Sequence, residues 1–365
     1  MLHRIEPPPA EAEHLRGFNT LLDLLLDALC EPATTPAMVT ADWLVVLWPL
    51  VPEDWVRAMC DRVREGESAL TLMKAVAGAS PAVKAELLAA FQSDRDAEKA
   101  YGDGSTHRAE VLPACAGSAV LRGQVKRLFQ RFYDPEFDPE FGLPDPANGN
   151  GDKLTRPGFV AAFCDHNKIG VCPYCDGSLS GTRAKLDHIL PKESFPFLSV
   201  TPDNLVPACT DCNSIQIKGR KIPLSQPPAN AATDWFHPYH RSADGAFNLG
   251  FLPPRANDEP RCVTLTNADA AAQRRLDNLE KLLGIAAHWS ERLPHEVNTL
   301  VKDLRARLRK GKAASVAAFL DSALDTAEAG IRNRAYSILN ASVCRASIAE
   351  DSQFRAELDA VFAAG

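Results

Sequence analysis

The sequence lacks a long apolar run. Its longest one, residues 43–51, contains Pro49 and is far shorter than the roughly 20 residues that a helix needs to cross a bilayer. The Leu-rich stretch 21–29 contains Asp23 and Asp27, and it follows three prolines instead of a basic start, which argues against a signal peptide. We therefore expect no membrane span and a cytoplasmic protein.

The sequence also lacks an excess of positive charge. It holds 40 Lys and Arg against 47 Asp and Glu, a net charge of −7. The imbalance lies in residues 1–110, where 10 basic residues face 18 acidic ones, and the rest of the chain is close to neutral. Such a region repels polyanions, so we expect it to be structural or to face a protein partner instead of gripping DNA.

A regular disulfide framework is missing as well, although the chain has ten cysteines. Four of them form two Cys-x-x-Cys pairs, Cys172 with Cys175 and Cys209 with Cys212. Four thiolates in this arrangement suit a tetrahedral Zn²⁺ ion, whereas unrelated thiols or a redox pair explain the shared spacing less well. We expect the other six to be buried thiols: Cys30, Cys60, Cys115, Cys164, Cys262 and Cys344.

The 365 residues suffice for two or three domains. Helical periodicity predicts a helical region over 1–133, and a tandem Asp-Pro-Glu-Phe followed by a Gly/Asn-rich run predicts a linker over 134–157. The pattern becomes helical again from about 267, so we expect a helical C-terminal domain over 246–365. The segment 158–245 between these regions carries the chemical motifs. Helices are predicted at 41–48, 53–64, 67–77, 81–92 and 159–167.

A closed four-cysteine zinc site has no open coordination position, so it stabilises a fold and does not catalyse. Chemistry must then come from the residues between the two pairs. Residues 186–191 are predicted to form a short strand that carries Asp187 and His188, which point to opposite faces unless a bulge re-aims them, and residues 204–207 are predicted to form the return strand. We expect a helix that carries Asn213 to begin at the second cysteine pair.

These motifs resemble those of the HNH endonucleases, the ββα-metal nucleases, in their zinc-stapled form. The likeness covers about 50 residues and includes Cys-x-x-Cys, Asp-His-Ile-x-Pro, Asn-Leu-Val-x-x-Cys-x-x-Cys-Asn and a basic tail, in the family's order. It implies a mainly α protein in which helical N- and C-terminal regions surround a small ββα-metal core.

The resemblance also implies residue roles. Asp187 and Asn213 inherit the positions that hold a divalent metal, His188 is the general base, and Asn204 braces the loop that orients the histidine. Oxygen ligands without an imidazole favour Mg²⁺, with Mn²⁺ as a substitute, over Zn²⁺ as the catalytic ion. An ordinary imidazole has a pKa near neutrality, so its uncharged form can take a proton from water if its other nitrogen is held by a carbonyl. The basic tail, expected to bind flanking phosphates, consists of Lys218, Arg220 and Lys221.

Other motifs are interpreted as structural. Asp165, His166 and Asn167 are expected to form a helix C-terminus, not a second metal motif. Residues 235–240 are expected to pack over the nuclease core, with His237 as a secondary candidate for substrate contact. The basic faces at 122–131 and 302–312 are expected to be solvated helix faces.

The sequence therefore predicts a metal-dependent DNA endonuclease. Its layout resembles the HNH nucleases of bacterial anti-phage systems, including the Septu-like kind that works with an ATPase, and this analogy makes the acidic N-terminal region a candidate for partner docking. Two alternatives stay open: a zinc-stapled nucleic-acid-binding module without cleavage, and a nuclease directed at RNA.

Overall fold

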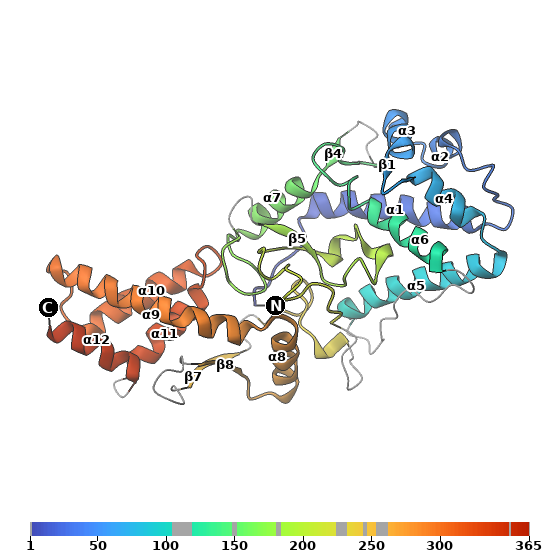
Figure 1. Cartoon of the computed structure of the whole chain (residues 1–365). Coiled ribbons are helices and arrows are strands. Elements are labelled where there is room, and N and C mark those ends of the chain that lie inside the picture. The colour runs from blue at the N-terminus through green and yellow to red at the C-terminus, as the bar shows by residue number, and fades with distance from the viewer. Residues whose placement is uncertain are drawn as a thin grey trace.

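The computed structural model of the chain describes residues 2–103, 119–147, 152–179, 184–223, 232–243, 247–252, 262–349 and 352–364. The protein is mainly α-helical: the described residues form twelve α-helices and four two-stranded antiparallel sheets. Figure 1 shows α1 to α6 at one end, a central unit around β5, and α9 to α12 at the other end. None of the described helices combines the length and apolar character that crossing a bilayer requires.

The N-terminal helices pack around buried aromatic side chains, with Phe18 between Trp48, Trp55 and Phe132. The side chain of Thr40 accepts a hydrogen bond at the start of α2, and that of Ser68 does so at the start of α4. The six helices are α1 (Pro9–Cys30), α2 (Ala41–Leu47), α3 (Glu53–Asp61), α4 (Ala69–Ala77), α5 (Pro81–Asp103) and α6 (Ala119–Arg131).

A small hairpin separates α3 from α4, where the sequence predicted two longer helices. Strands β1 (Val63–Arg64) and β2 (Glu67–Ser68) pair across a turn in which Glu65 and Gly66 have φ values of 50° and 81°. Left-handed backbone at two successive residues cannot continue a helix, so α3 ends early and α4 starts late. Helix α5, in contrast, runs eleven residues beyond its predicted end at 92.

The segment 134–157, expected to be a linker, is packed wherever the structure describes it. Strands β3 (Leu143–Pro144) and β4 (Lys153–Leu154) pair, and the side chains of Phe137 and Leu143 are fully buried. The indole N–H of Trp55 donates to the carbonyl of Gly142 at 2.8 Å. The repeated Asp-Pro-Glu-Phe thus supplies aromatic side chains to the N-terminal core, while residues 148–151 lie outside the described part. The domain boundaries themselves stay a prediction.

The central unit shares its core with both neighbours. Leu186, Phe197 and Leu205 belong to the same buried cluster as the N-terminal helices, whereas Val206 belongs to the cluster that contains α8 and α9. Its elements are α7 (Arg156–Asn167), β5 (Lys185–His188), β6 (Leu205–Ala208) and the short 3₁₀ turns η2 (Pro196–Leu198), η3 (Pro202–Asn204) and η4 (Ala232–Asp234). The unit is therefore wedged between two helical regions.

The C-terminal region opens with a hairpin, which the helical prediction for 246–365 did not include. Strand β7 (Asn248–Leu252) pairs with β8 (Cys262–Thr266), and Cys262 is exposed, so the expectation that it is a buried thiol is wrong. Strand β8 leads into α8, where Asp269 caps the helix. The remaining helices are α8 (Ala270–Leu283), α9 (Ile285–Arg309), α10 (Val316–Gly330), α11 (Ser337–Ile348) and α12 (Gln353–Ala363).

Asp176, directly after the first cysteine pair, joins distant parts of the chain. Its buried carboxylate lies 2.8 Å from Nε2 of His3 and accepts the backbone N–H of Ile338 at 2.9 Å. Beside it, the N–H of Leu2 donates to the carbonyl of Pro173 at 2.8 Å. The turn at residues 172–176 is thus bound both to residues 2–3 and to helix α11.

Candidate active site and metal centre

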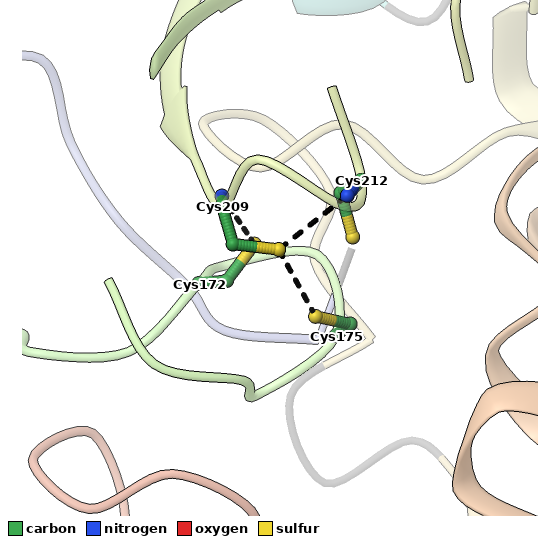
Figure 2. A group of neighbouring side chains, drawn as sticks. All are labelled: Cys172, Cys175, Cys209 and Cys212. Atoms are coloured by element: carbon green, nitrogen blue, oxygen red, sulfur yellow. Dashed lines mark hydrogen bonds between the residues drawn. The ribbon is translucent and has the colours of Figure 1, made fainter. Parts of the chain in front are cut away.

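The four cysteines of the two Cys-x-x-Cys pairs meet at one point, as Figure 2 shows. Their sulfur atoms all lie within 4.8 Å of one another, and all four side chains are buried. Backbone N–H groups point at the sulfurs: Gly177 donates to Cys175 at 3.4 Å and Cys209 donates to Cys172 at 3.3 Å. Amide donors of this kind stabilise thiolates, and the cluster can bind a zinc ion.

Hydrogen bonds from the other three thiols lower the pKa of Cys209 far below its ordinary value. Four sulfur ligands would leave no open coordination position, so this centre stabilises the fold and takes no direct part in chemistry. The centre joins the turn that carries Cys172 and Cys175 to the residues that directly follow β6. It therefore fixes the position of the strand pair that carries the candidate catalytic residues.

The strand pair places Asp187 opposite Val206 and His188 opposite Leu205. Strand β5 ends at His188, three residues earlier than predicted, although the N–H of Ile189 still bonds to the carbonyl of Asn204 at 2.9 Å. Asp187 and His188 line the same cleft of about 1060 Å³, even though alternation along a strand would send them to opposite faces.

The ring of His188 is held in one orientation. Its Nε2 atom lies 2.8 Å from the carbonyl oxygen of Ser199, and Tyr133 contacts it edge-on, with ring centroids 4.4 Å apart. Burial, together with the nearby cations Lys192 and Lys218, lowers the pKa of His188 to about 3. The ring is therefore neutral at pH 7 with the proton on Nε2, so that Nδ1 is its basic nitrogen.

Asn204 holds the loop that supplies this carbonyl. Its side-chain oxygen accepts the N–H of Leu190 at 2.7 Å, and its amide donates to the carbonyls of Leu190 and Leu198 at 3.0 and 3.2 Å. The side chain is buried, so each bond is made away from water. Asn204 thus lies where the resemblance expects a brace, and it links both ends of the loop around His188.

Asp187 is buried between a hydroxyl and an ammonium group. Tyr174 donates to its Oδ2 at 2.8 Å, and Nζ of Lys218 lies 3.0 Å from the same atom. Burial raises the pKa of Asp187, while Lys218 and the Tyr174 hydrogen bond act against that shift. Sequence reasoning did not find Tyr174, because nothing in a Cys-x-x-Cys pair indicates where its inner residues point.

Asn213 lines the cleft with Asp187 and His188, but it does not lie on a helix. The predicted helix after the second cysteine pair is wrong, because the helical bond from the N–H of Asn213 to the carbonyl of Cys209 is not continued and wider turns follow it. The N–H of Lys218 bonds to the carbonyl of Cys212 and that of Gly219 to the carbonyl of Ser214, and Gly219 has a φ of 45°. The expected third element of the ββα unit is therefore a series of turns.

The three basic residues of the tail lie in three different environments. Lys218 is fully buried and contacts both Asp187 and the carbonyl of His188, which differs from the exposed phosphate contact that we expected. Arg220 is exposed and lines the cleft. Lys221 donates to the carbonyl of Leu282 at 3.1 Å, at the end of α8. Of the three, Arg220 alone combines exposure with a place in the cleft.

Two of the motifs interpreted as structural behave as expected, whereas the basic face at 122–131 is not a solvated face, because Arg131 is buried and pairs with Glu136. Helix α7 ends at Asn167, and Lys168 follows in a left-handed conformation with a φ of 48°, which confirms the predicted helix C-terminus. His237 is buried, and its Nδ1 accepts the N–H of Tyr239 at 3.2 Å. It packs beside the unit and is not among the residues that line the cleft.

The candidate site offers donors for a hard divalent cation. Asp187 supplies carboxylate oxygens and Asn213 an amide oxygen, and both residues line one cleft. This donor set fits Mg²⁺ or Mn²⁺, which bind through one or two protein oxygens and keep several waters. Among the described residues, the cleft is lined by one sulfur, that of Cys164, and one imidazole, that of His188, so the oxygen donors favour a hard cation over Zn²⁺.

Comparison with known proteins points to the same segment. The family model "HNH endonuclease" matches residues 172–218. Protein ea31 of Escherichia phage lambda is 50% identical over 42 residues, a stretch that covers 12% of this chain and 14% of the phage protein. No solved structure matches the chain significantly. The match thus places an HNH endonuclease domain at residues 172–218 of a mainly helical chain and supports a nuclease activity in general terms.

Proposed function

We propose that the protein is a metal-dependent HNH endonuclease that hydrolyses phosphodiester bonds of DNA. One observation carries the proposal: the neutral His188, with Nε2 committed to the Ser199 carbonyl, shares a cleft with Asp187 and Asn213. A base with a fixed tautomer beside oxygen donors is the arrangement that hydrolysis of a phosphodiester by activated water requires.

In the proposed reaction, Nδ1 of His188 takes a proton from a water molecule as the water oxygen bonds to phosphorus. The bond from phosphorus to the 3′ oxygen breaks, and the electron pair leaves with that oxygen, which takes a proton from solvent water and so gives 5′-phosphate and 3′-hydroxyl ends. A divalent ion held by Asp187 and Asn213 would supply Lewis-acid stabilisation of the negative charge on the phosphate. Tyr174 and Lys218 position the Asp187 carboxylate, and Asn204 positions the loop that holds the His188 ring.

The direct test is nicking of supercoiled plasmid by the purified chain with Mg²⁺, Mn²⁺ or EDTA. We expect cleavage that requires the metal and disappears in His188→Ala. The matched control is His166→Ala, because His166 lies on the surface at the end of α7 and should leave cleavage intact. Equal cleavage by wild type and His188→Ala would overturn the assignment of the base.

The same assay separates the alternatives. A protein that retains zinc and binds DNA but never cuts would be a zinc-stapled binding module. Cleavage of single-stranded RNA without cleavage of DNA would make it an RNA nuclease. External water as the nucleophile needs no 2′-hydroxyl on the substrate, which favours DNA.

We further propose that the nuclease serves in anti-phage defence with a protein partner, such as an ATPase, that docks on the N-terminal region. This region is acidic, and on and beside α2 it exposes three apolar side chains, Met38, Val46 and Leu50. The test is phage plaque formation on cells that express the chain. Val46→Glu should retain plasmid nicking and lose protection, whereas equal plaque counts with wild type and His188→Ala would contradict the defence role.

A further inference from the structure

The cleft has a second wall that lies outside the matched HNH segment. This wall comes from the turns after α6 and from the start of α7, and its residues include Tyr133, Asp134, Asp138 and Arg156. Lys192, from the loop after β5, lies on the same side. Tyr133 and Arg156 thus approach the candidate base from outside the matched segment, whereas Lys192 lies inside it.

Two cations of this wall lie on a ring that contacts the base. The guanidinium carbon of Arg156 is 4.8 Å from the centre of the Tyr133 ring, and Nζ of Lys192 is 4.6 Å from it. The Tyr133 ring in turn contacts His188 at a centroid distance of 4.4 Å, and its hydroxyl donates to the carbonyl of Leu186 at 2.6 Å. Tyr133 therefore fixes both cations next to the position where a phosphate would react.

Carboxylates keep these cations in place. Asp134 lies 2.5 Å from Arg156 and also pairs with Lys192, while Asp138 pairs with Arg156. Burial would raise the pKa of Asp134, but the charges and hydrogen bonds of Lys192 and Arg156 outweigh it and lower that pKa. The wall carries two positive and two negative charges, so it is neutral as it stands.

Exposure distinguishes this group from a purely structural ion pair nearby. Arg131 and Glu136 are 2% and 0% exposed, whereas the side chains of Arg156 and Lys192 are 27% and 19% exposed and line an open cleft. The planar guanidinium of Arg156 has five N–H donors, and Asp134 and Asp138 engage its Nη1 and Nη2 atoms. Five donors exceed what two carboxylate contacts require, so this partly exposed group can also bind an oxyanion. Phosphate oxygens match that donor geometry.

We propose that Arg156 and Lys192 bind a backbone phosphate of the nucleic acid beside the scissile bond, and that this phosphate takes over part of their pairing from Asp134. The inference rests on the proposed nuclease function and adds substrate-binding residues that lie outside the predicted basic tail. Because the contact is to the backbone, it is insensitive to base sequence and sensitive to salt.

The experiment measures binding separately from cleavage. The full chain with His188→Ala is titrated against a short fluorescein-labelled DNA duplex over a series of salt concentrations. Arg156→Gln and Lys192→Gln should each weaken binding about ten-fold and reduce the slope of log K against log salt by about 1. Arg156→Lys keeps the charge and should keep the slope. Lys168→Gln is the matched control, because Lys168 pairs with Asp165 at the other end of α7 and does not line the cleft.

Asp134→Asn provides a test that does not depend on removing a cation. If a phosphate replaces this carboxylate, the variant should bind the duplex several-fold more tightly at a temperature where it is still folded. An unchanged salt slope in Arg156→Gln and Lys192→Gln, or weaker binding by Asp134→Asn, would overturn the inference while duplex binding by the parent persists. Absence of duplex binding by the parent would overturn the proposed function together with the inference.

Discussion

Nε2 of His188 lies 2.8 Å from the carbonyl oxygen of Ser199, eleven residues further along the chain. A backbone carbonyl can only accept, so it assigns the proton to Nε2 and leaves Nδ1 as the base. The carbonyl directly follows Leu198, and the side chain of Asn204 bonds to both Leu190 and Leu198 and so holds the loop between them. The protonation pattern of the imidazole is therefore set by loop geometry.

Asn204→Ala should loosen the loop at residues 190–199, so that the carbonyl of Ser199 no longer holds the His188 ring in place. The variant leaves the N–H of Leu190 without its buried acceptor, and the lost hydrogen bonds should reduce the free energy of unfolding by about 3 kcal/mol. Plasmid nicking should fall by more than ten-fold at a temperature where the variant is still folded. The control is Asn167→Ala, at the end of α7. A variant that loses stability but nicks at the wild-type rate would show that the loop does not orient the ring.

Lys218→Met should lower the free energy of unfolding, because it leaves the buried carboxylate of Asp187 without its cation. Lys218 is fully buried and pairs with Asp187 at 3.0 Å, and removing one partner of a buried pair costs about 3 kcal/mol or more. Chemical denaturation measures this loss. Lys221→Met, which removes a surface contact to α8, should cost far less, and equal losses in the two variants would contradict the pairing.

Removal of the cysteine-bound ion should unfold the central unit. Cys209→Ser removes the sulfur that accepts the N–H of Cys212 at 3.4 Å, and a metal-binding free energy that helps the chain to fold is lost with it. We expect less than one zinc per chain by mass spectrometry under native conditions and loss of near-UV circular dichroism. Cys262→Ser alters an exposed thiol and should retain both signals.

Asp94 predicts a pH-dependent stability. The residue is fully buried on α5, its carboxylate oxygens make no hydrogen bond to the described residues, and burial raises its pKa to about 8. Because the folded-state pKa lies above the unfolded value near 4, protonated Asp94 favours the folded state at low pH, and this contribution is lost as the pH rises from about 4 through about 8.

Asp94→Asn should therefore stabilise the protein at alkaline pH. We expect a gain of about 2 kcal/mol at pH 8.5 and little change at pH 4.5, measured by urea unfolding at both values. Asp96→Asn, two residues along the same helix at an exposed position, is the control. A gain of equal size at both pH values would indicate a packing effect and contradict the titration.

The sequence predicted the parts of this site that lie in a short motif, and it missed the parts that other segments supply. Residues 172 to 213 contain Cys172, Asp187, Asn204 and Asn213 in the order of the HNH motif, so the resemblance to that family predicted that they lie in one unit. The helical class followed from periodicity, as the buried stripe Leu293, Val297 and Leu304 of α9 illustrates.

What could not be predicted depends on contacts between distant segments. Tyr133, the last residue of the predicted helical region, contacts His188, and Arg156, from the stretch that composition marked as a linker, contacts the Tyr133 ring. Neither contact was predicted, because proline and glycine indicate where a helix ends but not what a folded turn packs against. The burial of Lys218 was missed for a similar reason. A lysine near a motif end is usually solvated, and only the fold reveals that a carboxylate lies within 3.0 Å of it.

The contacts of Asp176 cannot all form until a late stage of synthesis. Its carboxylate joins His3 to the backbone of Ile338, so the turn that carries Cys172 and Cys175 gains its full set of partners only after some 160 further residues have left the ribosome. The cysteines, the strand pair and the histidine are all made earlier than α11. A nascent chain therefore holds every residue of the site before it holds the helix that secures it, and a ribosome that stalls early would release an incompletely braced nuclease.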